Sequence, residues 1–241
     1  MFFKNHNKIK FYCELPEVKE QYPIIPAKLQ QFNWFRKSAQ CFKAIKKEKA
    51  AYEQITGIIK CPGVHPIMTK GHVMQSWFDL TIKPLEDNRF EFFIPQGLYS
   101  YLKEKNYDKR LISWFSGDDS AHAIPLQDEQ LSSLIKITLP WAVSIPKGWS
   151  LMLMPIPYPD MVEFTAVHGI LETGEYYQIN AIIKINQTKK EFTIPAGTPL
   201  FQLIPIKDVS DDVEILDYSD SIKQLETKNK FTANNTFVVN K

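Results

Sequence analysis

The chain has 241 residues, of which 44% are hydrophobic and 13% aromatic, and its formal net charge at pH 7 is +2. This share of apolar side chains is sufficient for a packed core, and the near balance of charges excludes a strong overall attraction to nucleic acid. The longest strongly apolar stretch, residues 149–156, contains Pro155 and is far shorter than the roughly 20 residues of a spanning helix, so no membrane span is predicted.

The beginning of the chain does not have the pattern of a secretion signal. The first ten residues are basic, but Cys13 and Glu14 follow them in place of an apolar run. We therefore expect residence in a host cytoplasm or in a virion, without secretion or membrane insertion. Cys13, Cys41 and Cys61 are widely spaced and odd in number, which is typical of reduced thiols and not of a disulfide framework.

The N-terminal part, residues 1–71, is expected to pack on the core as a strand with helical decoration. Residues 8–15 predict the strand, and residues 28–39 predict a short helix. Residues 42–55 are rich in Lys, Glu and Ala and lack Gly and Pro, which favours an exposed helix. Since acidic residues interrupt its lysines, we expect a solvated helix in preference to a nucleic-acid site.

From residue 72 the hydrophobic period becomes that of a strand. In residues 72–82, Met74, Phe78, Leu80 and Ile82 share one face, which predicts a single half-buried strand. Further short strands are expected at residues 89–94, 111–115, 134–139, 149–154, 162–167, 177–185, 191–194 and 200–206. This succession predicts a mainly β core over residues 72–207, built as a barrel, a sandwich or a jelly-roll-like fold.

A turn of the form Ile-Pro-x-Gly occurs three times, at residues 94–97, 145–148 and 194–197. Proline presets φ at the second turn position, and glycine permits an unusual dihedral angle at the fourth. We predict a corner between strands at each of the three sites.

The C-terminal part, residues 208–241, is acidic at first and then polar. It predicts a tail with one short helix at residues 218–227. Its first half carries six carboxylates: Asp208, Asp211, Asp212, Glu214, Asp217 and Asp220.

The sequence contains no complete catalytic signature, because a Gly-x-Ser-x-Gly elbow and a glycine-rich phosphate loop are both missing. The only local group of metal-ligand residues is Cys61, His65 and His72, with Cys41 upstream, and it lacks the close pairs typical of zinc sites. We therefore predict no catalytic residue, no metal and no cofactor, and keep Cys61, His65 and His72 as weak metal candidates.

One stretch of the core has the residues of a known family. Residues 169–176, GILETGEY, and residues 194–204, IPAGTPLFQLI, resemble the second half of the trimeric dUTPase and dCTP-deaminase barrel. The resemblance implies a dUTPase-like barrel in which Glu172 and Tyr176 face a sugar and base and Gln202 lies near a phosphate. The glycine-rich tail that closes over the phosphates in that family has no counterpart, because no glycine follows Gly197.

A longer resemblance extends from the N-terminal region to about residue 206. Its motifs, in order, include IPAK at residues 25–28, IKCP at residues 59–62, LPW at residues 139–141 and IPKGWS at residues 145–150. They look like an uncharacterised family of tailed bacteriophages and some bacteria. The resemblance implies a phage context and assigns no residue roles.

These observations leave three functions open. The leading expectation is a non-enzymatic phage protein, either a virion component or an assembly or host-interaction module, with protein partners and with self-association as an open alternative. Its proline-rich loop, PIPYP at residues 155–159, suits a rigid binding surface. The alternatives are a nucleotide-binding or nucleotide-hydrolysing protein with a dUTPase-like barrel, and a cupin-like small-molecule or metal enzyme.

Overall fold

The computed structural model describes seven segments: residues 8–30, 63–85, 90–107, 109–114, 134–157, 159–186 and 190–207. The helix expected at residues 42–55, most of the one at residues 28–39 and the tail at residues 208–241 lie outside the described residues. None of the described helices has the length and apolar character that crossing a membrane would require.

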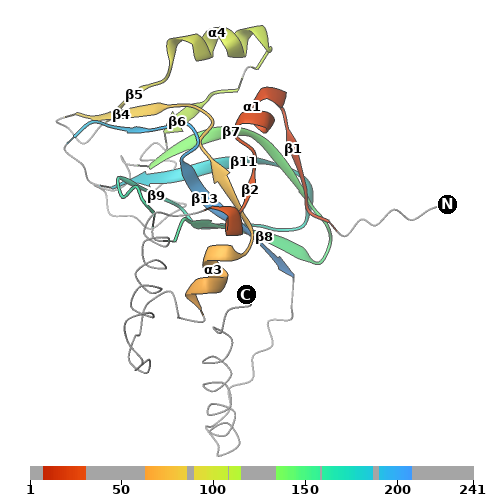
Figure 1. The fold of residues 1–241 in the computed structure, drawn as a ribbon. Coiled ribbons are helices and arrows are strands. Elements are labelled where there is room, and N and C mark those ends of the chain that lie inside the picture. Colours follow the sequence, from red (N-terminus) through yellow and green to blue (C-terminus); the bar gives the residue numbers. More distant parts are fainter. Residues whose placement is uncertain are drawn as a thin grey trace, which may run out of the picture.

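The first antiparallel sheet has the strand order β1-β7-β11-β9 (Figure 1). These strands are β1 (Lys10–Cys13), β7 (Leu134–Ile145), β11 (Gly174–Ile185) and β9 (Phe164–Ala166), and β6 (Ile112–Trp114) also pairs with β7. Strand β7 reads LIKITLPWAVSI, and ten of its twelve residues are buried. A strand that apolar on both faces belongs in the middle of a sheet, which is where it lies.

The second antiparallel sheet has the order β10-β8-β13-β3-β2, and the third has the order β12-β4-β5. The second contains β10 (Gly169–Leu171), β8 (Trp149–Pro155), β13 (Pro199–Lys207), β3 (His72–Gln75) and β2 (Ile25–Pro26). The third contains β12 (Phe192–Ile194), β4 (Leu80–Pro84) and β5 (Phe90–Phe93). A tight turn joins β7 to β8 and so connects the first sheet to the second.

Within the described residues, four short helical segments accompany the sheets: α1 (Pro16–Gln21), the 3-10 helix η1 (Ala27–Leu29), α3 (Val64–Thr69) and α4 (Gln96–Glu104). Figure 1 shows α1 and α4 at one end of the molecule and α3 at the other. Helix α1 begins at Pro16, a position where proline loses no hydrogen bond and already has a helical φ.

One hydrophobic core joins all three sheets. Leu80 and Ile82 of the third sheet, Ile135 of the first and Leu203 of the second are each 0% exposed and belong to the same cluster. A smaller cluster of Ala27, Met68, Val73 and Ile156 holds α3 against β3. The predicted mainly β fold with few helices is confirmed.

The prediction of one strand over residues 72–82 is wrong, although the side-chain pattern behind it is right. Met74, Phe78, Leu80 and Ile82 are all buried, yet β3 ends at Gln75 and β4 begins at Leu80 in a different sheet. The break is held from elsewhere in the chain. The amide of Ser76 donates to the carbonyl of Thr198 (2.8 Å), and the amide of Gly197 donates to the carbonyl of Ser76 (2.7 Å).

The first of the three Ile-Pro-x-Gly turns is also different from the prediction. Gly148 and Gly197 have φ of +80° and +84°, as expected at corners between strands. Gly97 instead lies inside α4, which follows Pro95 directly. The residues after Gly97 explain this, because Leu98, Tyr101 and Leu102 recur at helical spacing and form the packed face of α4.

Candidate functional site

The residues singled out by the dUTPase resemblance have different environments. Glu172 is exposed in the turn between β10 and β11. Gln202 on β13 is 2% exposed, and its side-chain amide donates to the carbonyls of Ile67 (2.8 Å) and Lys70 at the end of α3. The backbone of Tyr176 lies in β11, while its side chain is outside the described part of the structure.

Strand register shows how far apart these residues are. Leu171 pairs with Leu151 of β8, and Gln202 pairs with Met154 of the same strand. Three residues along β8 correspond to about 10 Å, and β8 itself separates β10 from β13 by another two strand spacings of about 10 Å in total. The structure therefore does not bring Glu172 and Gln202 together, and ligand binding by the predicted residues stays a prediction.

The weak metal candidates are not assembled into a centre within the described residues. His72 lies half-buried on β3 and contacts the ring of Phe11. Burial lowers the pKa of the His72 imidazole below its ordinary value. The side chains of His65 and Cys61 lie outside the described part of the structure. Among the described residues, no group of three or more His, Cys, Asp or Glu side chains is placed to hold a metal ion.

A cleft of about 800 Å³ lies between α4, the end of β5 and the segment that leads into β6. We call it the aromatic–basic cleft. It is lined by three aromatic rings, by aliphatic and amide side chains and by three cations, which are Phe92, Tyr99, Tyr107, Ile94, Leu102, Leu111, Ile112, Asn106, Lys103, Lys109 and Arg110. No carboxylate is among the described residues that line it.

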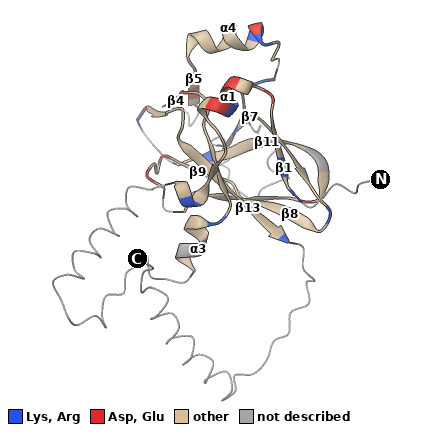
Figure 2. Cartoon of the chain, turned by 45° about the vertical axis from the view of Figure 1, so that its right-hand side comes forward, with Lys and Arg blue, Asp and Glu red and all other residues tan. Residues whose placement is uncertain are grey.

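Helix α4 forms one wall because it is held against α1. Leu102 is buried in the core, and Tyr101 donates its hydroxyl to Glu17 of α1 (3.1 Å). Lys105 pairs with the same carboxylate, and this hydrogen bond holds the pKa of Glu17 below its ordinary value. In Figure 2 the ribbon is coloured for acidic and basic residues on α1 and at the end of α4.

A sharp reversal after α4 brings the opposite wall into place. Asn106 has a φ of +52°, a left-handed conformation that Asn tolerates better than most residues. The amide of Tyr107 then donates to the carbonyl of Leu102 (2.9 Å), which closes the turn. The chain returns along the cleft and reaches β6, where Thr138 of β7 donates its amide to the carbonyl of Leu111 (2.8 Å).

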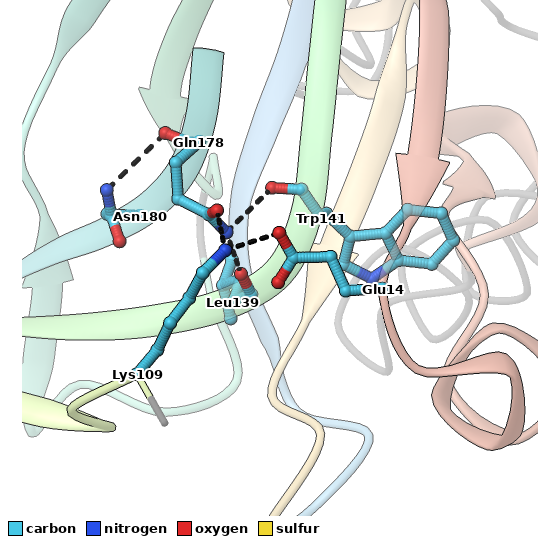
Figure 3. A network of polar contacts seen from close by, with 6 residues as sticks. All are labelled: Glu14, Lys109, Leu139, Trp141, Gln178 and Asn180. Atoms are coloured by element: carbon cyan, nitrogen blue, oxygen red, sulfur yellow. Dashed lines mark hydrogen bonds and ion pairs between the residues drawn. The ribbon is translucent and has the colours of Figure 1, made fainter. Parts of the chain in front are cut away.

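Lys109 is fixed at the base of the cleft by a polar network that depends on an irregularity in the first sheet (Figure 3). The pairing of β7 with β11 slips between Gln178 and Asn180, opposite Pro140. Proline in a strand is tolerated at such a bulge. The side-chain amide of Gln178 donates to the carbonyls of Leu139 and Trp141 (3.1 Å), which flank the proline.

The same Gln178 side chain accepts a hydrogen bond from the Lys109 ammonium group through its oxygen, and Lys109 also pairs with Glu14 (Figure 3). The ammonium group lies 5.8 Å from the centre of the Tyr107 ring, a cation–π contact. Lys109 is thus neutralised and positioned. Among the described residues Lys103 and Arg110 form no ion pair, so they leave the cleft with a net positive field.

Sequence reasoning missed this cleft because its residues come from β5, α4 and the segment at residues 106–112, which were expected to be strands and a corner. One signal was available. Residues 98–107 combine three tyrosines with two lysines and a helical apolar period, which together indicate an amphipathic helix with an aromatic face.

No protein-family model matches the sequence, and no curated protein matches it. Among solved structures, the chain is similar to a mutant dUTPase of Staphylococcus bacteriophage 80alpha with dUpNHpp, at 12% identity and a TM-score of 0.31, covering 62% of this chain and 87% of that one. It is also similar to a mutant dUTPase from phage phi11 of S. aureus, at 12% identity and a TM-score of 0.33, covering 70% of this chain and 90% of that one. Similarity of this size assigns neither a fold family nor a function.

Proposed function

We propose that this chain is a protein-interaction module whose aromatic–basic cleft takes a short acidic segment of a partner protein. The observation that carries the proposal is the combination, at one site, of a strand edge that no other described strand covers, aromatic rings, and two cations that form no ion pair with a described residue. In the phage setting implied by the sequence resemblance, such a module serves as a virion component or in assembly or host interaction.

The open strand edge is that of β5. Strand β5 pairs with β4, from Thr81 opposite Phe93 to Pro84 opposite Phe90, and it stands at the edge of its sheet. No other described strand pairs with its second side. An extended peptide can therefore add to β5 through main-chain hydrogen bonds, a common mode of peptide recognition.

The aromatic side chains at the rim supply contact area. Tyr99 lines the cleft and is 66% exposed, and the rings of Phe92 and Tyr107 line it too. Aromatic residues and arginine are enriched at protein interfaces because they bury large areas with little loss of side-chain entropy. Exposed rings beside a cleft of this size therefore favour a macromolecular partner.

The two cations of the cleft that form no ion pair with a described residue favour an acidic partner over a basic one. Lys103 and Arg110 are both exposed, so each ion pair they form contributes roughly 0.2–1 kcal/mol and is screened by salt. Contributions of this size select acidic over basic partners and speed encounter more than they set affinity. The partner segment is accordingly acidic, with aromatic or aliphatic residues between its carboxylates.

Binding of a labelled peptide tests the proposal. The probe is a fluorescein-labelled Glu-Phe-Glu-Tyr-Glu peptide, followed by fluorescence anisotropy, with a Lys-Phe-Lys-Tyr-Lys peptide as the reversed-charge control. We expect the full chain to bind the acidic probe, and the K103E/R110E variant to bind it roughly tenfold more weakly. Lys28→Glu, an exposed change on η1 outside the cleft, leaves binding unchanged.

A matched pair of tyrosines tests the aromatic rim separately. Tyr99→Ala weakens binding of the acidic peptide roughly five- to tenfold, as expected of an interface aromatic. Tyr12→Ala, on β1 and 49% exposed, leaves it unchanged. The proposal fails if the two peptides bind equally well, if the two tyrosine variants behave alike, or if dUTP binds while the acidic peptide does not.

A further inference from the structure

A second hollow, separate from the aromatic–basic cleft, is rich in lysine. It has a volume of about 430 Å³ and is lined by Lys8, Lys10, the turn at residues 144–147, Thr173 and Gly174. We call it the lysine hollow, after Lys8, Lys10 and Lys147.

Two turns and one strand hold the lysine hollow in shape. Lys10 of β1 pairs with Ser144 near the end of β7, which brings the start of the described chain to the turn that carries Lys147. Across the hollow, the hydroxyl of Thr173 lies within hydrogen-bond distance of the carbonyls of Pro146 (3.3 Å) and Trp149 (3.2 Å). The turn between β10 and β11 is thereby fixed against the turn between β7 and β8.

The charge of the lysine hollow is not compensated within the described structure. Lys8, Lys10 and Lys147 are all exposed, and none of them forms an ion pair with a described residue. The carboxylate of Glu172, beside Thr173, is exposed and does not line the hollow. Three ammonium groups around one concave surface repel each other and attract an anionic segment.

The chain itself supplies such a segment at this place. Strand β13 ends at Lys207, which pairs with Trp149, two residues from Lys147 (Figure 1). The described part of β13 therefore ends about 10 Å from the lysine hollow. Residues 208–220 carry six carboxylates. An extended chain spans up to about 3.5 Å per residue, so its length from Lys207 is sufficient for Asp208, Asp211 and Asp212 to contact the lysines.

We propose that the lysine hollow is the docking site of the acidic segment at residues 208–220 of the same chain. Because the segment is tethered beside its site, its effective concentration there is on the order of millimolar, which makes weak ion pairs sufficient for docking. The docked segment covers the lysine hollow and leaves the aromatic–basic cleft open.

Zero-length crosslinking with a carbodiimide on the full chain tests this proposal, because the reagent joins only carboxylates and amines already in contact. We expect crosslinks from Asp211 or Asp212 to Lys8, Lys10 or Lys147, identified by mass spectrometry. In about 0.5 M NaCl, where the Debye length falls to about 4 Å, their yield drops several-fold. Lys28 and Lys103, exposed lysines elsewhere, serve as internal controls.

Acetylation of the amines provides a second measurement that does not need a crosslink. The D208N/D211N/D212N variant keeps the lysine hollow intact, and we expect Lys147 to be acetylated roughly threefold faster in it than in the original chain, with Lys28 unchanged. Equal crosslinking to Lys103 or Lys28 overturns the proposal, as does an unchanged rate at Lys147. Crosslinks only between isotopically distinguished copies overturn docking within one chain.

Discussion

Replacing Gly71 by alanine is expected to damage the fold far more than replacing glycines of similar conformation. Gly71 precedes β3 with a φ of +76°, and a Cβ atom there would lie 2.1 Å from the carbonyl oxygen of Leu203 and 3.2 Å from the Cα atom of Ile204. Its own carbonyl accepts a hydrogen bond from the amide of Ala27 (3.0 Å). Neither neighbour is a flexible side chain, so the backbone of β13 or β3 must move.

The expected loss of stability has two parts. The left-handed conformation costs an alanine about 1–2 kcal/mol. The overlap with the backbone of β13 adds about 1–3 kcal/mol, the usual penalty for forcing atoms into packed space. Gly148→Ala is the matched control, because Gly148 has a φ of +80° and nothing within 4 Å of the added atom. Gly148→Ala should lose only the free energy of the left-handed conformation, so the free energies of unfolding of the two variants should differ by about 1–3 kcal/mol.

Urea unfolding followed by circular dichroism measures both free energies of unfolding, provided that the slope of free energy against urea concentration is the same in the two variants. Gly71→Asn separates the two parts, because asparagine tolerates the left-handed conformation but brings the same Cβ atom. It should remain less stable than Gly148→Asn. If Gly71→Ala costs no more free energy than Gly148→Ala, the close approach of residues 71 and 203 is not the reason for glycine at this position.

Two further predictions concern buried polar groups. Gln202→Leu removes the amide that serves the carbonyls of Ile67 and Lys70, so it should lower the free energy of unfolding by about 1–3 kcal/mol, while Gln75→Leu on β3 has a smaller effect. Burial lowers the pKa of His72, so the stability linked to its neutral form is present above the unfolded-state pKa of 6.5 and is lost as the pH falls through the folded-state value. The urea midpoint should therefore fall less between pH 7 and pH 5, roughly either side of that pKa, in His72→Asn than in the original chain. The control is His168→Asn, a change at an exposed histidine, whose midpoint should fall as much as that of the original chain. An equal fall in all three proteins would contradict this assignment.

The fold class follows from the sequence because strand alternation is a local property. Met74, Phe78, Leu80 and Ile82 are buried as their spacing predicts. The division of that run into β3 and β4 is not local, because it depends on hydrogen bonds from Ser76 to residues more than a hundred positions later. Sequence alternation alone carries no information about such a bond.

Pro140 is a second position at which a distant residue overrides the local sequence signal. Proline ends the strand predicted at residues 134–139, yet β7 continues to Ile145. The continuation is possible because Gln178, on another strand, satisfies the carbonyls of Leu139 and Trp141. The aromatic–basic cleft is harder still to predict, because Lys103 and Arg110 become neighbours only through the reversal at Asn106. Glu172, Tyr176 and Gln202 were suggested by resemblance, and their ligand binding stays a prediction.

The pairing of β1 with β7 has a consequence for how the chain is made. The ribosome releases β1 about 130 residues before its partner at residues 141–144. Until then Lys10–Cys13 has no strand to join. Closure of the first sheet therefore waits for a strand that is made much later than β1, and this long-range pairing is expected to slow folding during biosynthesis.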